Sequence, residues 1–445
     1  MSSPTDGSYV SRREFLASSA VTLGASSSLF ALPHRAHAQG SDTIRVGLIG
    51  CGGRGTGAAS DIVSGSMGME IVAMGDVVQD RLTRSRTVLA EQIKGQLKVD
   101  DAHAFVGFDA YRHVIAADVD LVILATPPGF RPAHLQAAIE AGKHVFMEKP
   151  VAVDPVGVRS VIASAELAAQ KNLAIVAGTQ RRHDPKYLET IRRIHDGAMG
   201  DIVSGQVYWN QGGLWNYERT PGMSDTEWQI RNWLYFTWLS GDHVVEQHIH
   251  NIDVANWVMN DHPARANGVG GRQVRVDPSY GHIFDHFAIE FEYANGARIL
   301  SMCRQQDGTS RYVGERFTGT RGTSSPSDEN PWIRGAQNWQ WAAQGEPVNP
   351  YVQEHTDLVA SIRAGKPLNE GRQVAESTLS AIMAREAAYT GRIITWDEML
   401  ASDLDLTPGP MAFGPLQVPP VAQPGVTKLS RPPFGHAREA TTGDR

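Results

Sequence analysis

A short apolar strand that runs straight into a glycine-rich turn limits the possible folds of this chain more than any other feature. Residues 44–57 read IRVGLIGCGGRGTG and contain a G-x-G-x-x-G pattern. In such a turn the first glycine permits the tight bend, the second lets the backbone approach a pyrophosphate, and the third lets a helix pack closely. The pattern predicts a dinucleotide-binding loop. The loop residues assigned to the cofactor are Gly50, Gly52, Gly53, Arg54 and Gly55.

The next strand ends in a carboxylate at the spacing typical of dinucleotide-binding folds. Residues 70–75 form a second apolar run, and Asp76 follows it, about 20 residues beyond the glycine turn. A carboxylate there can accept a hydrogen bond from the adenosine ribose 2′-hydroxyl and would repel a 2′-phosphate. NAD is therefore favoured over NADP. Because Arg81, Arg84 and Arg86 lie close by, NADP stays open as the less favoured cofactor.

The first 38 residues have the pattern of a twin-arginine export signal. Arg12 and Arg13 precede a modest apolar run at 15–32, and the tripeptide at 36–38 (AHA) offers an A-x-A cleavage site. A membrane anchor needs about 20 strongly apolar residues, whereas serines interrupt this run. We expect a protein exported to the periplasm in folded form, and a disordered N-terminus or a membrane anchor are the alternatives.

Composition narrows the possible partners. A chain of 445 residues has room for two domains. Its formal net charge of −7 is evenly spread, so it offers no basic surface for nucleic acid or an anionic membrane. Only two cysteines, Cys51 and Cys303, are present, which excludes a disulfide framework and any cysteine-based metal site. We therefore expect a small-molecule partner, no nucleic acid, and no membrane span after signal removal.

Hydrophobic periodicity divides the rest of the chain into two domains and an arm. Residues 41–178 alternate short apolar strands with helical segments, as in a Rossmann domain. Residues 179–400 carry longer strands of alternating polarity, which indicates an α+β domain with a large, mostly antiparallel open sheet. Residues 401–445 are rich in proline and predict an arm that is disordered or lies on the surface or on a neighbouring subunit. The expected fold class is α/β. The strands expected are 44–49, 71–74, 121–125, 144–147 and 174–177 in the first domain, and 202–210, 286–293, 297–305 and 311–318 in the second.

Two loops at the carboxyl ends of first-domain strands add candidate site residues. In an open α/β sheet, ligands bind at these ends. Lys149 follows such a strand, so it can hydrogen-bond a substrate hydroxyl or assist proton transfer. A plain surface lysine is the alternative. The residues assigned to the cofactor in this part of the chain are Thr126, Pro127, Pro128, His134, Glu148 and Lys149.

A polar segment in the second domain supplies a candidate base. If residues 241–257 form one helix, the spacing places His243, Glu246, His250 and Asp253 on one face. His250 would take the hydroxyl proton, because histidine titrates near neutral pH. Glu246 would orient the substrate or the imidazole. A metal site and a purely structural role are the alternatives, although no H-E-x-x-H pattern is present and we expect no metal.

Taken together, these motifs resemble the Gfo/Idh/MocA oxidoreductases. The resemblance rests on the glycine loop, Asp76, the Thr126-Pro127-Pro128 turn, Gly142-Lys143-His144 and Glu148-Lys149-Pro150, and it extends through the histidine segment. It implies a Rossmann domain followed by an open-sheet domain. The family's catalytic lysine falls on Lys149, and its acid–histidine pair falls on Glu246 and His250. Many members have aspartate where this chain has Glu246. The open sheet commonly pairs with another subunit, so a dimer or tetramer is expected.

These features together predict a sugar-directed enzyme. The predicted substrate contacts are Arg181, His183, Tyr187, His243 and Asp253. The second domain is also rich in aromatic residues, whose faces stack on sugar rings. Since the periplasm holds no recycled pool of free NAD, we expect oxidation of a secondary hydroxyl of a sugar, cyclitol or glycoside with tightly retained cofactor. The alternatives are a redox-neutral, NAD-dependent glycoside hydrolase and an exported binding protein without turnover.

Overall fold

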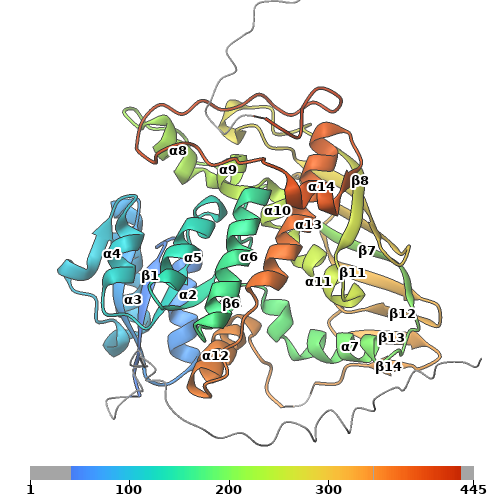
Figure 1. The fold of residues 1–445 in the computed structure, drawn as a ribbon, viewed down its shortest axis with the longest axis horizontal. Coiled ribbons are helices and arrows are strands. Elements are labelled where there is room, and N and C mark those ends of the chain that lie inside the picture. The colour runs from blue at the N-terminus through green and yellow to red at the C-terminus, as the bar shows by residue number, and fades with distance from the viewer. Residues whose placement is uncertain (1–41, 344, 432–445) are drawn as a thin grey trace, which may run out of the picture. The chain divides into compact units, whose positions relative to one another are not determined.

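Two β-sheets of different kinds organise the chain (Figure 1). The computed structural model describes residues 42–343 and 345–431. The predicted export signal at 1–38 lies outside the described residues, as does the end of the predicted arm at 432–445. The first sheet ends at Ala177 and the second begins at Ile202, on either side of the boundary predicted at residue 178.

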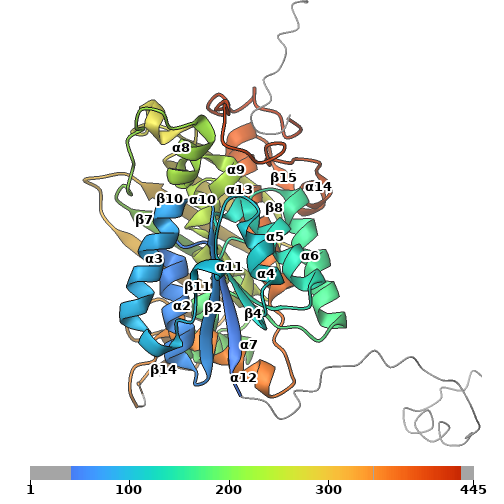
Figure 2. The same ribbon diagram turned by 90° about the vertical axis from the view of Figure 1, so that its left-hand side faces the viewer.

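The first sheet has six parallel strands in the order β3-β2-β1-β4-β5-β6, which is the Rossmann arrangement. Its strands are almost entirely apolar because helices cover both faces (Figure 2). The strands are β1 Ile44–Ile49, β2 Met69–Asp76, β3 Ala104–Val106, β4 Leu121–Leu124, β5 His144–Met147 and β6 Ile175–Ala177. The helices are α2 Gly53–Gly65, α3 Gln79–Gln92, α4 Ala110–Ala116, α5 Arg131–Glu140 and α6 Pro155–Gln170, with a 3-10 turn η3 at Pro128–Phe130.

The second sheet has nine strands in the order β14-β13-β12-β11-β7-β10-β9-β8-β15. All neighbours are antiparallel except β7 and β10, which run parallel. Burial alternates along β9 and β10, so one face of the sheet is covered. The predicted α/β class with a mostly antiparallel second sheet is confirmed. The strands are β7 Ile202–Gln211, β8 Pro263–Gly271, β9 His286–Tyr293, β10 Arg298–Gln305, β11 Tyr312–Gly319, β12 Gly322–Ser325, β13 Trp332–Gly335, β14 Trp339–Gln340 and β15 Ile394–Thr395.

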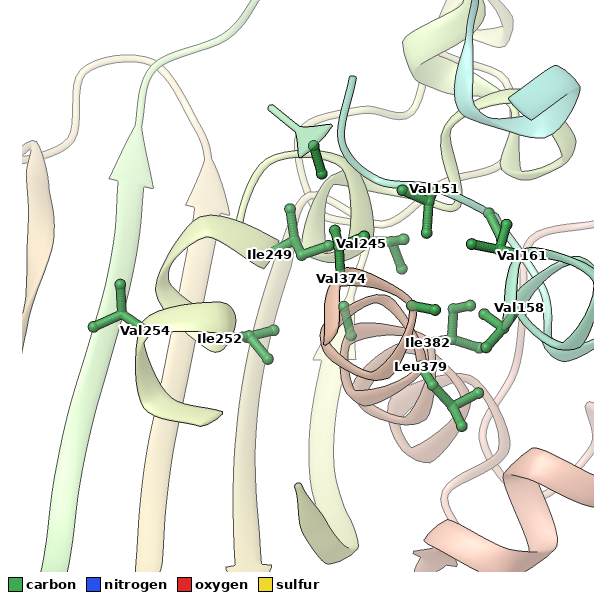
Figure 3. Packing of buried hydrophobic residues seen from close by; sticks show 14 of the residues in the cluster. Val151, Val158, Val161, Val245, Ile249, Ile252, Val254, Val374, Leu379 and Ile382 are labelled. Carbon is green, nitrogen blue, oxygen red and sulfur yellow. The ribbon is translucent and has the colours of Figure 1, made fainter. Parts of the chain in front are cut away.

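A long helix, α13, joins the two sheets. It contacts α6 in the domain of the first sheet, which we call the first or Rossmann lobe. It also contacts α10, α11 and β8 in the domain of the second sheet, which we call the second lobe. Figure 3 shows Leu379 and Ile382 of this helix beside Val158, with Val245 and Ile252 nearby, and all five side chains belong to one buried cluster. The remaining helices and 3-10 turns of the described residues are η1 Lys94–Gln96, η2 Asp101–His103, η4 Gln180–His183, α7 Pro185–His195, α8 Asp225–Arg231, η5 Trp233–Tyr235, α9 Thr237–Ser240, α10 His243–Glu246, α11 Ile249–Met259, η6 Pro278–Tyr280, α12 Pro350–Arg363, α13 Gly371–Thr390 and α14 Trp396–Ala401.

The proline-rich arm lies along the chain's own surface as far as the structure describes it. Residues 403–431 contain no helix or strand. Leu404 and Leu406 are buried, and Arg431 donates two hydrogen bonds to the carboxylate of Glu386 on α13, both at 2.7 Å. The described part of the arm is therefore anchored at both ends. Among the described residues, the helices are all too short or too polar to cross a bilayer.

Candidate active site

The glycine turn has the backbone geometry that a dinucleotide loop needs. Gly50 adopts φ +98°, which favours glycine, and the main chain of Ala125 and Thr126 leaves no room for a Cβ there. A Cβ on Gly55 would overlap the carbonyl oxygen of Gly50, so strand and helix meet through bare backbone. By contrast, Gly52 and Gly53 face open space at the start of α2. The free N–H groups of this helix end suit a pyrophosphate, so the residues present fit the dinucleotide.

Replacement of Gly55 provides a local test of this loop. Gly55→Ala should lower the free energy of unfolding by about 1–3 kcal/mol and weaken NAD binding, because the methyl group meets backbone that cannot move aside. Gly57→Ala is the matched control in the same helix, since only the Arg54 side chain lies near, at 3.8 Å. The control should stabilise the helix by about 0.5–1 kcal/mol. Urea unfolding and NAD titration of both variants check the contrast, and equal effects at the two positions would contradict it.

Asp76 lies at the carboxyl end of β2, where the sequence places it. Its carboxylate accepts hydrogen bonds from the backbone N–H groups of Cys51, at 2.7 Å, and Val78, at 2.8 Å. Burial raises the pKa of this carboxyl, although both hydrogen bonds and the charge of Arg81 oppose the rise. The two hydrogen bonds tie the end of β2 to the glycine loop.

Cys51 and Cys303 are both buried free thiols, so neither takes part in a disulfide.

One cavity of about 870 Å³ extends from the glycine loop to the end of β5 and the break between α10 and α11. It brings together residues from both lobes that the sequence placed in the site. The lysine and the histidine predicted to carry the chemistry open into this same space. The predicted residues that line it are Gly50, Gly52, Gly53, Arg54, Asp76, Thr126, Pro127, Pro128, Glu148, Lys149, Glu246 and His250.

Lys149 is held by Glu246. Its ammonium group donates to the main-chain oxygen of Glu246 at 2.6 Å and to the Oε1 atom at 3.0 Å, and both side chains are about nine-tenths buried. The main-chain contact exists because α10 ends at Glu246, which leaves this carbonyl without an intrahelical partner. The other carboxylate oxygen, Oε2, has no hydrogen-bond partner among the described residues. The lysine predicted from the first lobe and the acid predicted from the second therefore meet directly.

The prediction of one continuous histidine helix is wrong. The segment forms two helices, α10 His243–Glu246 and α11 Ile249–Met259, with Gln247 and His248 between them. The break changes which side chains share a face. His243 packs against Phe287, at 5.1 Å between ring centroids, and does not line the cavity.

His250 opens into the cavity as a neutral imidazole. Its ring stacks on Trp209, with centroids 5.5 Å apart and planes 24° apart. Burial lowers the pKa of His250 well below its usual value, and the positive charges of Lys149 and Arg181 lower it further. An imidazole that stays unprotonated can accept a proton from a substrate hydroxyl. Asp253, on the same predicted face, pairs with Arg182 through two hydrogen bonds of 2.9 Å.

Arg54 links the glycine loop to the strand end that carries Lys149. Its guanidinium lies 2.8 Å from Oε1 of Glu148 and 2.9 Å from Oδ2 of Asp61, and it stacks over Tyr351 at 5.0 Å. Tyr351 belongs to α12, so a helix far along the chain reaches the cavity. His134, predicted to bind the cofactor, does not line the cavity. Its Nδ1 atom lies 3.3 Å from the hydroxyl of Thr126, which does line the cavity. Burial lowers the pKa of His134 to about 3.

The five predicted substrate contacts all lie outside the cavity. Four of them already have polar partners within the protein, whereas the Nε2 atom of His243 has none among the described residues. Arg181 and the Tyr187 hydroxyl both contact the buried carboxylate of Glu315, at 2.6 and 3.1 Å. Asp253 also accepts a hydrogen bond from Ser377 at 2.7 Å. The sequence predicted polar residues that lie near the site. Arg181, Tyr187 and Asp253 do not face the cavity, because each binds a side chain from an element far along the chain. The five residues are Arg181, His183, Tyr187, His243 and Asp253.

His183 pairs with two carboxylates. Its Nδ1 atom lies 2.6 Å from Asp357 and its Nε2 atom lies 3.2 Å from Glu370. Burial alone would lower the pKa of this imidazole, but the two carboxylates raise it from 6.5 to about 9. The folded state therefore binds this proton more tightly than the unfolded state does.

The pair of carboxylates should make part of the stability depend on pH. Because the folded pKa exceeds the unfolded one, the contribution of His183 is fully present below pH 6.5 and is lost as the pH rises through about 9. The cost of His183→Gln should therefore shrink by up to about 3 kcal/mol across this window. Urea unfolding of wild type and variant over this pH range measures it. A cost that does not change with pH would contradict the assigned ion pairs.

The sequence motifs did not predict several residues that line the cavity, among them Arg131, Tyr351 and Gln247. Arg131 at the start of α5 donates to the main-chain oxygen of Leu124 at 2.8 Å, and burial lowers its pKa to about 10. Tyr351 and Gln247 also line the cavity. For Tyr351 no sequence signal exists, since its position depends on how α12 packs against α2. Within the described ranges no cluster of three or more histidine, cysteine, aspartate or glutamate side chains is arranged to hold a metal ion.

Comparisons with known proteins agree with this geometry. A profile described as "Oxidoreductase family, NAD-binding Rossmann fold" matches residues 44–178, and one described as "GFO/IDH/MocA C-terminal domain" matches residues 187–325. Inositol 2-dehydrogenase 4 of Saccharopolyspora erythraea is 38% identical over 157 residues, or 35% of this chain and 42% of that protein. The chain thus spans less than half the length of this relative. Inositol 2-dehydrogenase 3 of the same organism is 27% identical over 362 residues, or 79% of this chain and 95% of that protein.

Solved structures share the fold. A levoglucosan dehydrogenase in complex with NADH superposes with a TM-score of 0.64 at 18% sequence identity, covering 79% of this chain and 99% of that one. At this identity the likeness shows the fold alone. The two profile matches together cover more than half of the chain. This protein therefore belongs to the Gfo/Idh/MocA family of NAD-binding oxidoreductases, whose members act on CH–OH groups.

Proposed function

We propose that this protein oxidises a secondary hydroxyl of a sugar, cyclitol or glycoside and retains its dinucleotide between turnovers. The observation that carries the proposal is the shared cavity. Lys149 from the first lobe and His250 from the second open into the space that begins at the glycine loop. An ammonium group and a neutral imidazole beside a dinucleotide loop suit the oxidation of an alcohol.

The charges of His250, Lys149 and Glu246 suit different roles in the proposed reaction. A bound dinucleotide would supply the acceptor for the hydride of the substrate carbon. The neutral imidazole of His250 takes the hydroxyl proton, and the ammonium group of Lys149 hydrogen-bonds the same oxygen and stabilises negative charge on it. Glu246 positions Lys149 through its main-chain and side-chain oxygens. The Oε2 atom of Glu246 is buried and has no partner among the described residues, so a rotation of this side chain would be needed for it to accept a hydrogen bond from a substrate hydroxyl.

Relatives support the substrate class and the cofactor. The two relatives compared above are inositol 2-dehydrogenases, and the solved structure is a levoglucosan dehydrogenase with NADH. A cyclitol and a sugar both present secondary hydroxyls. Asp76 favours NAD over NADP, because a carboxylate repels a 2′-phosphate. The proposal includes export to the periplasm, which rests on the twin-arginine pattern outside the described residues, and assembly as a dimer or tetramer.

A redox-neutral glycoside hydrolase is the second candidate. This route oxidises the glycoside, eliminates the aglycone, adds water and reduces the product again, so it needs a further base for the proton beside the keto group. His243, one candidate for that base, does not line the cavity. Glu246 does, and its Oε2 atom has no partner in the described part of the chain, which keeps this candidate open.

A product assay separates the candidates. The purified full chain is first denatured, and the released NAD is quantified by mass spectrometry. A second, native sample of the protein is incubated with inositols, aldoses and nitrophenyl glycosides. A keto product with stoichiometric bound NAD supports the oxidoreductase, and free aglycone with no keto product supports the hydrolase. Absence of both NAD and turnover would favour a binding protein and refute the proposal.

A further inference from the structure

The cavity has a second wall that the Rossmann lobe does not provide. It consists of Trp215 and Tyr217 from the loop after β7, Ile230 of α8 and Trp233 of η5. We name residues 213–236 the aromatic wall. Trp215 is 38% exposed and Tyr217 is 53% exposed, so their rings keep free surface. Large aromatic faces that border a cavity and remain uncovered are suited to stacking on a ligand.

The backbone of the aromatic wall is held in shape from within. Asn232 accepts a hydrogen bond from the N–H of Tyr217 and donates one to its carbonyl oxygen, both at 2.8 Å. The Tyr235 hydroxyl donates to the main-chain oxygen of Trp215, also at 2.8 Å. The loop that carries the exposed rings is therefore fixed to the 3-10 turn behind it.

The aromatic wall is tied to the Rossmann lobe close to Asp76. Arg231 donates two hydrogen bonds to the carboxylate of Asp80, at 3.1 and 3.2 Å. Arg81 donates in return to the main-chain oxygen of Arg231 at 3.4 Å. Asp80 and Arg81 follow Asp76 by a few residues. In Rossmann folds the residue at the end of this strand binds the adenosine ribose. The wall therefore borders the adenosine half of the expected cofactor site.

The C-terminal arm braces the outer side of the aromatic wall, as the red segment beside α8 in Figure 1 shows. The N–H and the hydroxyl of Thr226 both donate to the carbonyl oxygen of Gly414 at 3.1 Å. Gln229 donates to the carbonyl oxygen of Leu416 at 2.7 Å. The N–H of Leu416 donates to Asp225 at 3.1 Å. Every one of these bonds joins α8 to a segment that comes 187 to 191 residues later in the chain.

The same arm also contacts the Rossmann lobe. The rings of Phe413 and Phe108 lie 5.0 Å apart, and the N–H of Leu406 donates to Asp154 at 2.9 Å. One buried apolar cluster includes side chains from the Rossmann lobe, the wall and the arm. Its members include Val78, Phe130, Ile230, Trp238, Leu404 and Leu406.

We propose that the aromatic wall binds the adenosine half of the dinucleotide and that the C-terminal arm slows its release by holding this wall in place. The inference rests on the proposed function, because it explains how the same cofactor is retained. The rings of Trp215 and Trp233 offer flat surfaces for the purine. Release past the wall requires Arg231 to leave Asp80 and α8 to move against the arm. Those contacts add to the barrier for dissociation.

The test measures how fast bound NAD is lost. Arg231→Ala separates the wall from α3, and the double variant Asp225→Ala/Phe413→Ala loosens the arm while the pairing of Arg431 with Glu386 stays intact. Arg392→Ala is the matched control, since Arg392 forms an exposed ion pair with Glu398 at 2.8 Å away from the cavity lining. Each full-length protein is loaded with NAD, desalted and incubated with an NAD-degrading enzyme that destroys released cofactor. Bound NAD is then counted by mass spectrometry over time.

Both test variants should lose NAD about tenfold faster than wild type, and the control should lose it at the wild-type rate. Circular dichroism shows whether each variant is folded, and the two variants disturb different contacts, so either one alone can decide. Wild-type retention in both folded variants would overturn the inference and leave the proposed function standing. A wild-type protein that never holds NAD would overturn both.

Discussion

Lys149→Met should reduce turnover about a thousandfold while the amount of bound NAD stays at the wild-type level. The ammonium group is the cavity's donor to the substrate oxygen in the proposed reaction, and methionine fills similar space without charge. Lys149 also lowers the pKa of His250, because the two positive charges repel each other. Without this charge the pKa of His250 rises toward its ordinary value. The acid limb of the kcat/KM profile should therefore move to higher pH.

The controls for Lys149→Met separate chemistry from folding. Lys171→Met removes a lysine that only caps backbone, since it donates to the carbonyl oxygens of Ile139 and Glu140 at 3.0 and 2.8 Å. That variant should turn over at the wild-type rate. Lys149→Arg restores the charge in a different shape and should recover part of the activity and the original position of the acid limb. Turnover of Lys149→Met within about threefold of wild type would refute the assigned role.

Glu386→Gln should lower the free energy of unfolding by about 3–5 kcal/mol. Glu386 is fully buried and neutralises two arginines at once. Arg385, also fully buried, donates to it at 2.8 Å, and Arg431 of the arm donates two hydrogen bonds of 2.7 Å. These positive charges lower the pKa of Glu386 in spite of its burial, so the carboxylate stays ionised. Glutamine would leave two desolvated guanidinium groups without a counter-charge.

A surface pair provides the comparison for Glu386→Gln. Glu398 pairs with Arg392 at the same nominal distance of 2.8 Å, but both side chains are at least one-third exposed. Glu398→Gln should cost less than about 1 kcal/mol, because water screens an exposed pair. Guanidinium unfolding of both variants measures the two costs. If Glu386→Gln costs no more than Glu398→Gln, the buried network does not hold the arm as described.

Much of the fold was predictable because its elements follow simple periodic patterns. The strands β1 and β5 of the first sheet and β9 of the second have the predicted bounds. The short edge strand β3 was missed, since its three residues carry no pattern of their own. The strand β8 was also missed because PARANGVGG is rich in glycine and alanine, which disfavour strands. Its strand conformation comes from pairing with β9.

The site was only partly predictable, because several of its contacts depend on packing between distant elements. Lys149, Glu246 and His250 follow from motif and spacing, and the structure brings all three to one cavity. The break after Glu246 could not be read from helical spacing, and it is the break that turns His243 away. Arg181 shows a second reason for failure. Its partner Glu315 lies 134 residues later in the chain.

Transfer of deuterium from substrate carbon to cofactor tests the central claim most directly. The NAD-loaded wild type and the Lys149→Met variant are incubated with carbon-deuterated inositol, glucose and levoglucosan, and the released cofactor is examined by mass spectrometry. The account predicts deuterium in the nicotinamide of the wild-type sample with at least one of these substrates, and almost none in the variant. A cofactor that stays free of deuterium with every substrate, or equal labelling in both proteins, would contradict it.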